Sequence, residues 1–470
     1  MGGGLTQLVL KGQLDDFITS NPDISFYQFA YKRHTNFSME SIKLYFETNP
    51  IITNTNNIYK CKIDRHADLL SNMYFIFTLP DIYSDENYRF RWIQNVGTLI
   101  IKKITLTIGP SIVDNLTGEY ILLSNELSLL VKDNYNKITG NDGYLTDPKI
   151  TYPIIKINNN KFVEIFYPSG NKELNIPSIK KKEIILPLPF WFSKYPSLAL
   201  QLLRLQNEDI YINLELENVE NLYQIYSNDL KMYISPSYYN DLYSTKININ
   251  TFTKDIINLN SYIEANYIYL DTGERELLMS QVITRILIEQ TFISNNYSVT
   301  SGDGSSTTVE LMGANTHIKE LLWTLKRDDY FKYNDNINYT NTIPENKENP
   351  ILTSAIIYFN KSINRLEQKE ANYYNIIQPY QHHSCIPKQG IYCYSFGIFP
   401  EKWQPTGSYN GSTVSTSLCV YVNGGNNKII NDKLINSGKQ TYNYNYELKY
   451  YIRNYNIIEY NSGSAKLKYI

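Results

Sequence analysis

The sequence predicts an all-β fold of the sandwich or barrel type, and three observations lead to that prediction. Residues 391–399 alternate between two sets of side chains, and both sets are largely apolar or aromatic, as is typical of a strand buried between two layers. Prolines stand on both sides, with Pro387 before the segment and Pro400 after it, and proline closes strands because it lacks a backbone donor. Segments with strand character recur between residues 41 and 216 and again between 283 and 458. One face of the 391–399 strand would carry Ile391, Cys393, Ser395, Gly397 and Phe399, and the other Tyr392, Tyr394, Phe396 and Ile398.

The remaining elements follow from local patterns. The predicted strands are residues 41–47, 72–79, 99–109, 183–192, 210–216, 263–270, 283–292, 319–325, 355–360 and 446–458. Residues 119–131 instead place leucines near helical spacing and predict a helix. Residues 217–261 are polar and weak in pattern, so they predict an inserted loop region, and residues 298–308, 328–349 and 423–439 predict exposed loops.

Composition excludes several classes of protein. A chain of 470 residues is long enough for two or three domains. Its 44 basic and 46 acidic residues leave no basic excess, so direct contact with nucleic acid is not predicted. Four cysteines without paired spacing, and no secretory signal segment, indicate a reducing compartment. There is no run of about 18 apolar residues that would predict a membrane-spanning helix.

No catalytic, cofactor-binding or metal-binding residue is predicted. His382, His383 and Cys385 form a metal-like cluster, but a structural zinc site takes four ligands, usually in two spaced pairs, and only Cys393 lies near. These side chains are therefore predicted to pack within the fold, and His34 to be packed or hydrogen-bonded. The chain also lacks the nucleophile elbow, zincin, phosphate-loop and dinucleotide motifs, so we predict no enzyme and no cofactor.

Several segments resemble, in the same order along the chain, those of the major capsid proteins of nucleocytoplasmic large DNA viruses, the double jelly-roll family. The matching segments are residues 2–8 (GGGLTQL), 12–15, 31–37 (YKRHTNF), 92–109, 187–200, 378–381 (QPYQ), 394–398 (YSFGI), 404–407 (QPTG) and 455–463. The chain departs from the family pattern at residues 459–465, which lack the closing R-I-M-S-G-M-G-G wording. It departs again at residues 360–362 (NKS), where the family has an N-G-x-D-R turn.

The resemblance implies an all-β protein of two consecutive eight-stranded antiparallel jelly-roll β-sandwiches with short helices and long loops. It implies an N-terminal arm at residues 1–25 and a first jelly roll at 26–271, with the inserted region 217–261. A linker at 272–282 and a second jelly roll at 283–470 follow.

The resemblance also implies a structural virion protein that forms pseudo-hexagonal homotrimeric capsomers, which tile an icosahedral capsid. Its partners would be two further copies, neighbouring capsomers, minor capsid proteins and the inner membrane side of the virion, after assembly in the host cytoplasm. Two alternatives stay open: a divergent capsid paralogue, or a β-sandwich virion protein that binds glycans or receptors through loop aromatics.

Overall fold

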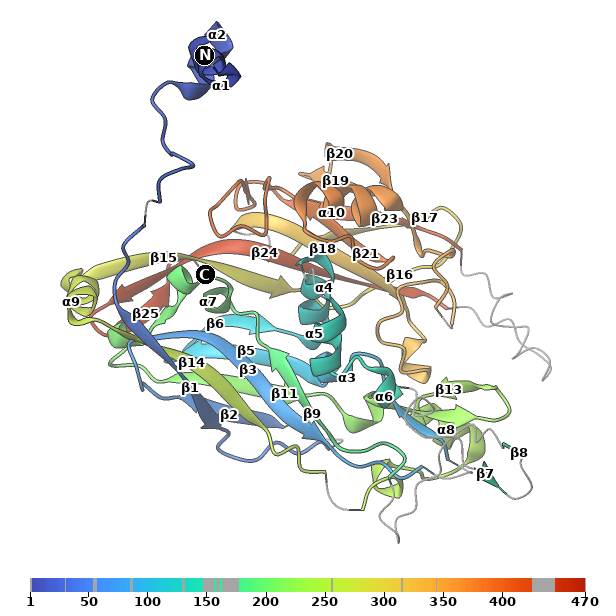
Figure 1. The fold of residues 1–470 in the computed structure, drawn as a ribbon. Helices are drawn as coiled ribbons and strands as arrows, with labels where there is room; N and C mark the ends of the chain where they lie inside the picture. Colours follow the sequence, from blue (N-terminus) through green and yellow to red (C-terminus); the bar gives the residue numbers. More distant parts are fainter. Residues whose placement is uncertain are drawn as a thin grey trace.

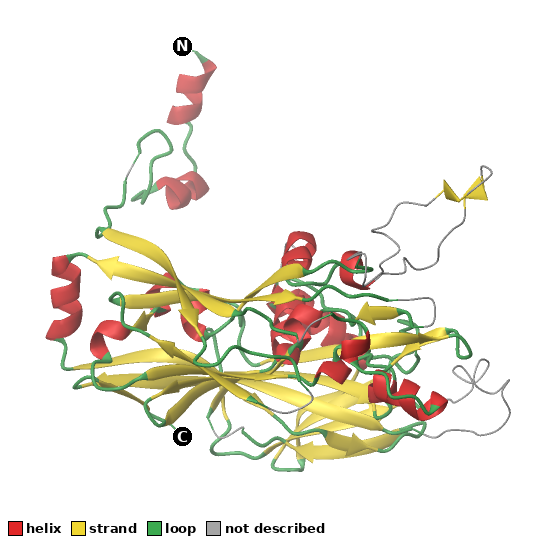
Figure 2. Ribbon diagram, turned by 90° about the horizontal axis from the view of Figure 1, so that it is seen from below, coloured by secondary structure: helices red, strands yellow, loops and turns green. Residues whose placement is uncertain are grey.

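The computed structural model describes residues 2–29, 31–53, 57–84, 88–128, 132–146, 156–157, 161–162, 177–254, 257–313, 316–343, 345–424 and 444–469. It contains two β-sandwiches, here called the first lobe (strands β1 to β14) and the second lobe (strands β15 to β25). In Figure 1 the first lobe lies below the second, and helix α9 (Thr272–Ser280) joins them at one end. Strands dominate both lobes, as Figure 2 shows, and the predicted all-β fold is confirmed.

The first lobe consists of two antiparallel sheets and a small third one. One sheet has the order β1 (Phe37–Tyr45), β14 (Tyr262–Leu270), β3 (Leu69–Leu79), β10 (Leu200–Gln201), with β9 (Lys182–Pro187) also on β3. The second has the order β2 (Ile58–Ile63), β11 (Ile210–Leu216), β5 (Ile101–Ile108), β6 (Ser111–Leu116). The third joins β13 (Met232–Ile234), β12 (Tyr223–Ser227) and β4 (Phe90–Trp92). Strand β11 shows why these sequences form a sandwich: Ile210, Ile212 and Leu214 are buried, and the residues between them are half-exposed.

The second lobe repeats this topology. Its larger sheet has the order β15 (Ile283–Ile293), β24 (Tyr446–Asn461), β18 (His317–Arg327), β21 (Ile391–Ser395), with β16 (Tyr297–Val299), β22 (Tyr409–Asn410) and β25 (Ser464–Leu467) attached. The other has the order β17 (Ser305–Glu310), β23 (Thr416–Val422), β19 (Leu352–Phe359), β20 (Ile363–Glu370). When the main strands of the two lobes are paired in chain order, each sheet of the first lobe matches a sheet of the second. In sheet order, β1-β14-β3-β9 corresponds to β15-β24-β18-β21, and β2-β11-β5-β6 to β17-β23-β19-β20.

Short helices connect the strands. They are α3 (Val96–Leu99), α4 (Gly118–Ser128), α5 (Lys132–Ile138), α6 (Gly143–Thr146), α7 (Trp191–Lys194), α8 (Pro236–Tyr243), α10 (Gln378–His382) and the π-helical turn η7 (Tyr373–Ile377) before α10. The 3-10 turns are η2 (Pro196–Leu198), η3 (Leu202–Arg204), η4 (Val219–Asn221), η5 (Ile249–Thr251) and η6 (Tyr330–Lys332), and a separate ribbon joins β7 (Lys156–Ile157) to β8 (Lys161–Phe162). Helix α4 begins at a glycine because a Cβ on Gly118 would lie 2.0 Å from the carbonyl oxygen of Thr98. Among the described residues, no helix combines the length and the apolar character needed to cross a membrane.

Near the N-terminus, α1 (Gly3–Val9) and α2 (Gln13–Thr19) stand away from both lobes (Figure 1), and neither helix has a buried residue. Several of their exposed side chains are apolar, among them Leu5, Leu8, Leu14 and Phe17. His34, predicted to be packed or hydrogen-bonded, is exposed, and its Nδ1 lies 2.8 Å from the carbonyl oxygen of Thr35.

The predicted strand at residues 391–399 is shorter in the structure but alternates as expected. Ile391 and Cys393 join the apolar core of the first lobe, whereas Tyr392 and Tyr394 join that of the second. The strand ends at Ser395, whose hydroxyl donates to the carbonyl oxygen of Gly397 and turns the chain out of the sheet.

Residues 217–261 differ from the prediction of a loop region. The described part of this stretch contains β12, β13 and α8, and it packs inward rather than looping out. The reason is aromatic packing: Phe90 stacks on Tyr223 with 4.9 Å between ring centroids, and Phe252 lies 5.1 Å from Phe90. A few large rings spaced irregularly along the chain can fix such a region without producing a periodic pattern.

Candidate functional site at the interface between the two lobes

The strands β24, β18 and β21 in the larger sheet of the second lobe are buried on both faces. Along β18, Leu321 and Trp323 point into the core of the second lobe, while Leu322 joins the core of the first. Strand β24 does the same, since Tyr450 and Tyr451 belong to different cores. Helix α4 of the first lobe lies against this sheet (Figure 1). The sheet is therefore a wall shared by the two lobes, and polar side chains on its first-lobe side must find partners there.

The first polar group on this wall is centred on Glu119, in the first turn of α4. Its carboxylate lies 2.6 Å from the Lys326 ammonium and 3.2 Å from that of Lys449, and it accepts a hydrogen bond of 3.2 Å from the hydroxyl of Tyr339. Burial alone would raise the pKa of Glu119, but the two lysines hold that pKa well below its usual range. A carboxylate of the first lobe thus forms ion pairs with two cations of the second.

Arg453 of β24 makes the second connection. Its Nε donates to the hydroxyl of Tyr120 at 2.8 Å, and its two terminal nitrogens donate to Ser124 at 3.1 Å and to Glu320 at 2.9 Å. Tyr120 and Ser124 lie on α4, whereas Glu320 lies on β18 beside Arg453. One buried guanidinium therefore uses its planar fork to fix the helix of one lobe on the sheet of the other.

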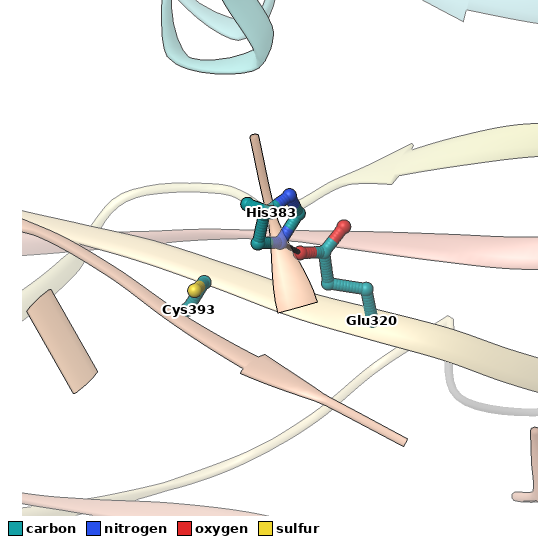
Figure 3. A group of neighbouring side chains, drawn as sticks. All are labelled: Glu320, His383 and Cys393. Atoms are coloured by element: carbon teal, nitrogen blue, oxygen red, sulfur yellow. Dashed lines mark hydrogen bonds and ion pairs between the residues drawn. The ribbon is translucent and has the colours of Figure 1, made fainter. Parts of the chain in front are cut away.

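The third group surrounds His383, directly after α10. Figure 3 shows its ring beside the carboxylate of Glu320 and near the thiol of Cys393. The Nε2 atom is hydrogen-bonded to Glu320, and Nδ1 lies 3.1 Å from the carboxylate of Glu401. Burial disfavours the charged ring, but Glu320 outweighs burial and, with Glu401, raises the pKa of His383 to about 12. Burial would raise the pKa of Glu320, yet His383 and Arg453 lower it to about 2. His383 is thus an imidazolium held between two carboxylates.

A fourth group involves α7 and β15. Glu289 accepts from Lys194 at 2.5 Å and also from Lys319. Burial alone would raise the pKa of Glu289, but Lys194 and Lys319 lower it to about 2. Next along β15, the backbone N–H of Thr291 donates to Asp114 of β6 at 3.3 Å. These bonds extend the polar contact between the lobes beyond α4.

Donor chemistry at His383 favours ion pairing over metal binding. Glu320, His383 and Cys393 place one donor atom each within 4.8 Å of one another, as a metal site would. However, Arg453 already neutralises Glu320, and both ring nitrogens of His383 face carboxylates. Burial raises the pKa of the Cys393 thiol to about 11, which keeps it protonated and a poor ligand. That no metal binds here stays our prediction.

The structure separates the residues of the predicted metal-like cluster. Only His383 enters the charged interface, where Cys393 joins it. His382 turns away, with Nδ1 at 2.9 Å from the carbonyl oxygen of Ile398, and the backbone N–H of Cys385 donates to Leu127 of the first lobe.

Sequence reasoning missed Glu119, Glu320 and Arg453, which carry the interface. A signal was present for two of them. Glu320 is followed by the apolar residues 321–323 of the predicted 319–325 strand, and Arg453 follows the apolar residues 450–452 of the 446–458 strand. A charge inside a strand that is buried on both faces requires a buried partner.

The His383 group predicts a defined pH range of maximal stability. The pKa of Glu320 is depressed on folding, so its contribution is present above the unfolded value near 4.5 and is lost as the pH falls towards about 2. The pKa of His383 is raised, so its contribution is present below the unfolded value near 6.5 and declines as the pH rises towards about 12. Urea midpoints measured from pH 3 to 10 are expected to be highest between about 4.5 and 6.5. The variant His383→Gln should flatten the alkaline side, and an unchanged alkaline slope would contradict this assignment.

Two family models match the chain and together cover nearly all of it. The model described as "Major capsid protein N-terminus" matches residues 25–271, and the model described as "Large eukaryotic DNA virus major capsid protein" matches residues 274–466. The major capsid protein of Phaeocystis pouchetii virus is 26% identical over an alignment 567 residues long, and that of Pyramimonas orientalis virus is 28% identical over one 493 residues long. Both alignments cover 100% of each chain.

Solved structures share the fold. PBCV-1 VP54, fitted into a reconstruction of the virophage Sputnik, has a TM-score of 0.67 at 20% identity, covering 95% of this chain and 100% of that one. The Faustovirus major capsid protein has a TM-score of 0.64 at 12% identity, covering 95% and 94%. These likenesses confirm the predicted double jelly roll. With both lobes matched by the family models, the chain belongs to the major capsid protein family of large eukaryotic DNA viruses, a family of structural virion proteins.

Proposed function

We propose that this chain is the repeating subunit of an icosahedral shell, in which three copies form one pseudo-hexagonal capsomer. The observation that carries the proposal is the repeated topology of the two lobes, joined by a buried charged interface. Three copies of a two-lobed chain present six similar lobes, and a ring of six has the outline needed to tile a surface. The Glu119 and Arg453 groups join the two lobes and would fix the angle between them, which such a ring requires.

The same proposal assigns the segments of the chain and their partners. Residues 1–25 form an arm, residues 26–271 and 283–470 form the jelly rolls, and residues 272–282 link them. Neighbouring capsomers surround each trimer. The exposed apolar side chains of α1 and α2 support contact between the arm and minor capsid proteins or the inner membrane side of the virion. Assembly takes place in the host cytoplasm, without direct contact to nucleic acid.

The mass of the purified protein in solution tests this proposal. Light scattering is expected to give three times the chain mass of 54.8 kDa, and the value should persist through dilution, because capsomer contacts are extensive. A monomer at all concentrations would contradict the proposal. It would favour one of the two alternatives, a capsid paralogue or a glycan- or receptor-binding virion protein. A glycan-binding assay would then distinguish between these two.

A further inference from the structure

The repeated topology also relates two connections that look different in sequence. Helix α4 follows β6 and precedes β9, the strand that pairs with β3. The η7–α10 segment follows β20 and precedes β21, the strand that pairs with β18. Because β6 corresponds to β20 and β9 to β21, these two helical segments occupy equivalent places in their lobes. Each therefore projects from its own lobe in a similar way.

Within the chain, the α4 segment already has its partner. It lies on the outward face of the β24-β18 pair, where Glu119 meets Lys326 and Lys449, and Tyr120 meets Arg453. The rings of Tyr120 and Tyr451 are 5.6 Å apart on the same face. In this contact, the helical segment of one lobe packs on the central strands of the next lobe.

The equivalent segment of the second lobe has an uncovered apolar surface. Ile376, Ile377, Tyr380 and Ile398 form this surface, here called the α10 surface, and Tyr380 is 77% exposed. Ile398 belongs to it because His382, at the end of α10, lies against its carbonyl oxygen. Isolated exposed apolar residues are ordinary, but four on one short segment and its neighbouring loop are typical of an interaction surface.

The equivalent sheet of the first lobe has an uncovered face as well. Strand β1 corresponds to β15 and β14 to β24, and the outward side chains of β1 and β14 pair in register, Lys43 with Glu264 and Tyr45 with Tyr262, whereas Ile268, opposite Met39, is buried. The Lys43 ammonium lies 4.5 Å from the ring centre of Tyr262, and the Tyr45 ring 6.2 Å from it. Met39 and Tyr45 are both more than 60% exposed. This mixed aromatic, apolar and charged face is here called the β1 face.

We infer that the α10 surface of one copy docks on the β1 face of the next copy, in the way that α4 docks on β24 and β18 within the chain. The inference rests on the proposed trimer and names its contact. It commits to a second copy of this chain because each uncovered surface is the structural equivalent of a partner in the interface already formed. In Figure 1 the α10 surface lies in the upper lobe and the β1 face in the lower one. The contact is therefore heterologous, and it closes into a ring of three when each copy is rotated by a third of a turn from the last.

Three variants test this contact. Ile377→Asp places a charge on the α10 surface, and Tyr45→Asp places one on the β1 face. Leu242→Asp on α8 is the matched control, since Leu242 is 45% exposed and Ile377 is 43% exposed. In Figure 1 α8 lies at the end of the molecule away from β1 and α10. By light scattering at equal concentration, each of the first two variants is expected to lose the trimer, with at least a tenfold weaker association. Leu242→Asp is expected to keep the trimer. All three variants are expected to remain folded.

Mixing the two interface variants gives a sharper result. Ile377→Asp retains an intact β1 face, and Tyr45→Asp retains an intact α10 surface, so one contact can form between them. A 1:1 mixture is expected to yield a heterodimer but no trimer. Either variant forming a full trimer alone would overturn the inference, as would a mixture that stays monomeric at ten times the concentration. A monomeric wild-type protein would instead contradict the proposed trimer itself.

Discussion

Replacing Glu119 with glutamine is expected to lower the free energy of unfolding by about 3–5 kcal/mol. The substitution keeps the shape of the side chain but leaves the partly buried Lys326 and Lys449 at the lobe interface without their shared carboxylate. An uncompensated cation at a partly buried interface costs more than a lost surface pair because water solvates it only in part. Urea unfolding at pH 6 measures the difference, from the change in midpoint at constant slope.

An exposed pair provides the control for Glu119. Glu310 and Lys361 are 3.4 Å apart, and both side chains are more than half exposed, so Glu310→Gln is expected to change stability by no more than about 1 kcal/mol. Adding Lys449→Met to Glu119→Gln should recover part of the loss, since one unpaired cation is removed with its partner. Equal effects of Glu119→Gln and Glu310→Gln would show that the buried cluster does not stabilise the interface.

The variant Arg453→Met is expected to uncouple the two lobes as well as to destabilise the chain by about 3–5 kcal/mol. It removes the bonds to Tyr120 and Ser124 of α4 and leaves Glu320 with one cationic partner fewer. Calorimetry is expected to show two separated unfolding transitions where the unaltered chain shows one, because each lobe retains its own sandwich core. Proteases should also cut faster near α9, which joins the lobes.

Arg365→Met is the matched control for this experiment. Arg365 lies on β20, is exposed, and contacts Tyr394 with its guanidinium 5.9 Å from the ring centre. Its removal is expected to leave the transition single and to shift stability by about 0.5–1 kcal/mol at most. If Arg453→Met unfolds in one transition at an unchanged temperature, Arg453 does not hold the lobes together.

Local patterns predicted a strand or helix well where the periodic spacing of apolar side chains determines it. The 391–395 strand shows two apolar faces because it lies in a wall shared by two cores, and its sequence has no polar side to mark solvent. The helix predicted at residues 119–131 matches α4, Gly118–Ser128, and residues 129–131 lie outside the described part of the chain. Residues 217–261 were mistaken for a loop region because their order comes from rings such as Tyr223 that meet distant residues.

The charged interface between the lobes could not be predicted from the sequence for a different reason. Glu119 and Lys449 are 330 positions apart, and Glu320 meets Arg453 across 133. Local periodicity tells which face of an element is buried but not which element covers it. A charge next to apolar residues in a buried strand indicates that a partner exists, and only the packing of two lobes shows that the partner of Arg453 includes the hydroxyl groups of α4.

The position of β24 in its sheet has a consequence for folding during synthesis. This strand lies between β15 and β18, with Ile283 opposite Asn461 and Leu322 opposite Tyr451. Both neighbours leave the ribosome first: 119 positions separate Arg327 from Tyr446, or about 6–24 s at typical elongation rates. Throughout that interval two long apolar strand edges, and the α4 surface that Arg453 later binds, have no partner. The nascent chain is thus most prone to aggregation just before β24 appears, which is the stage at which a chaperone would protect it.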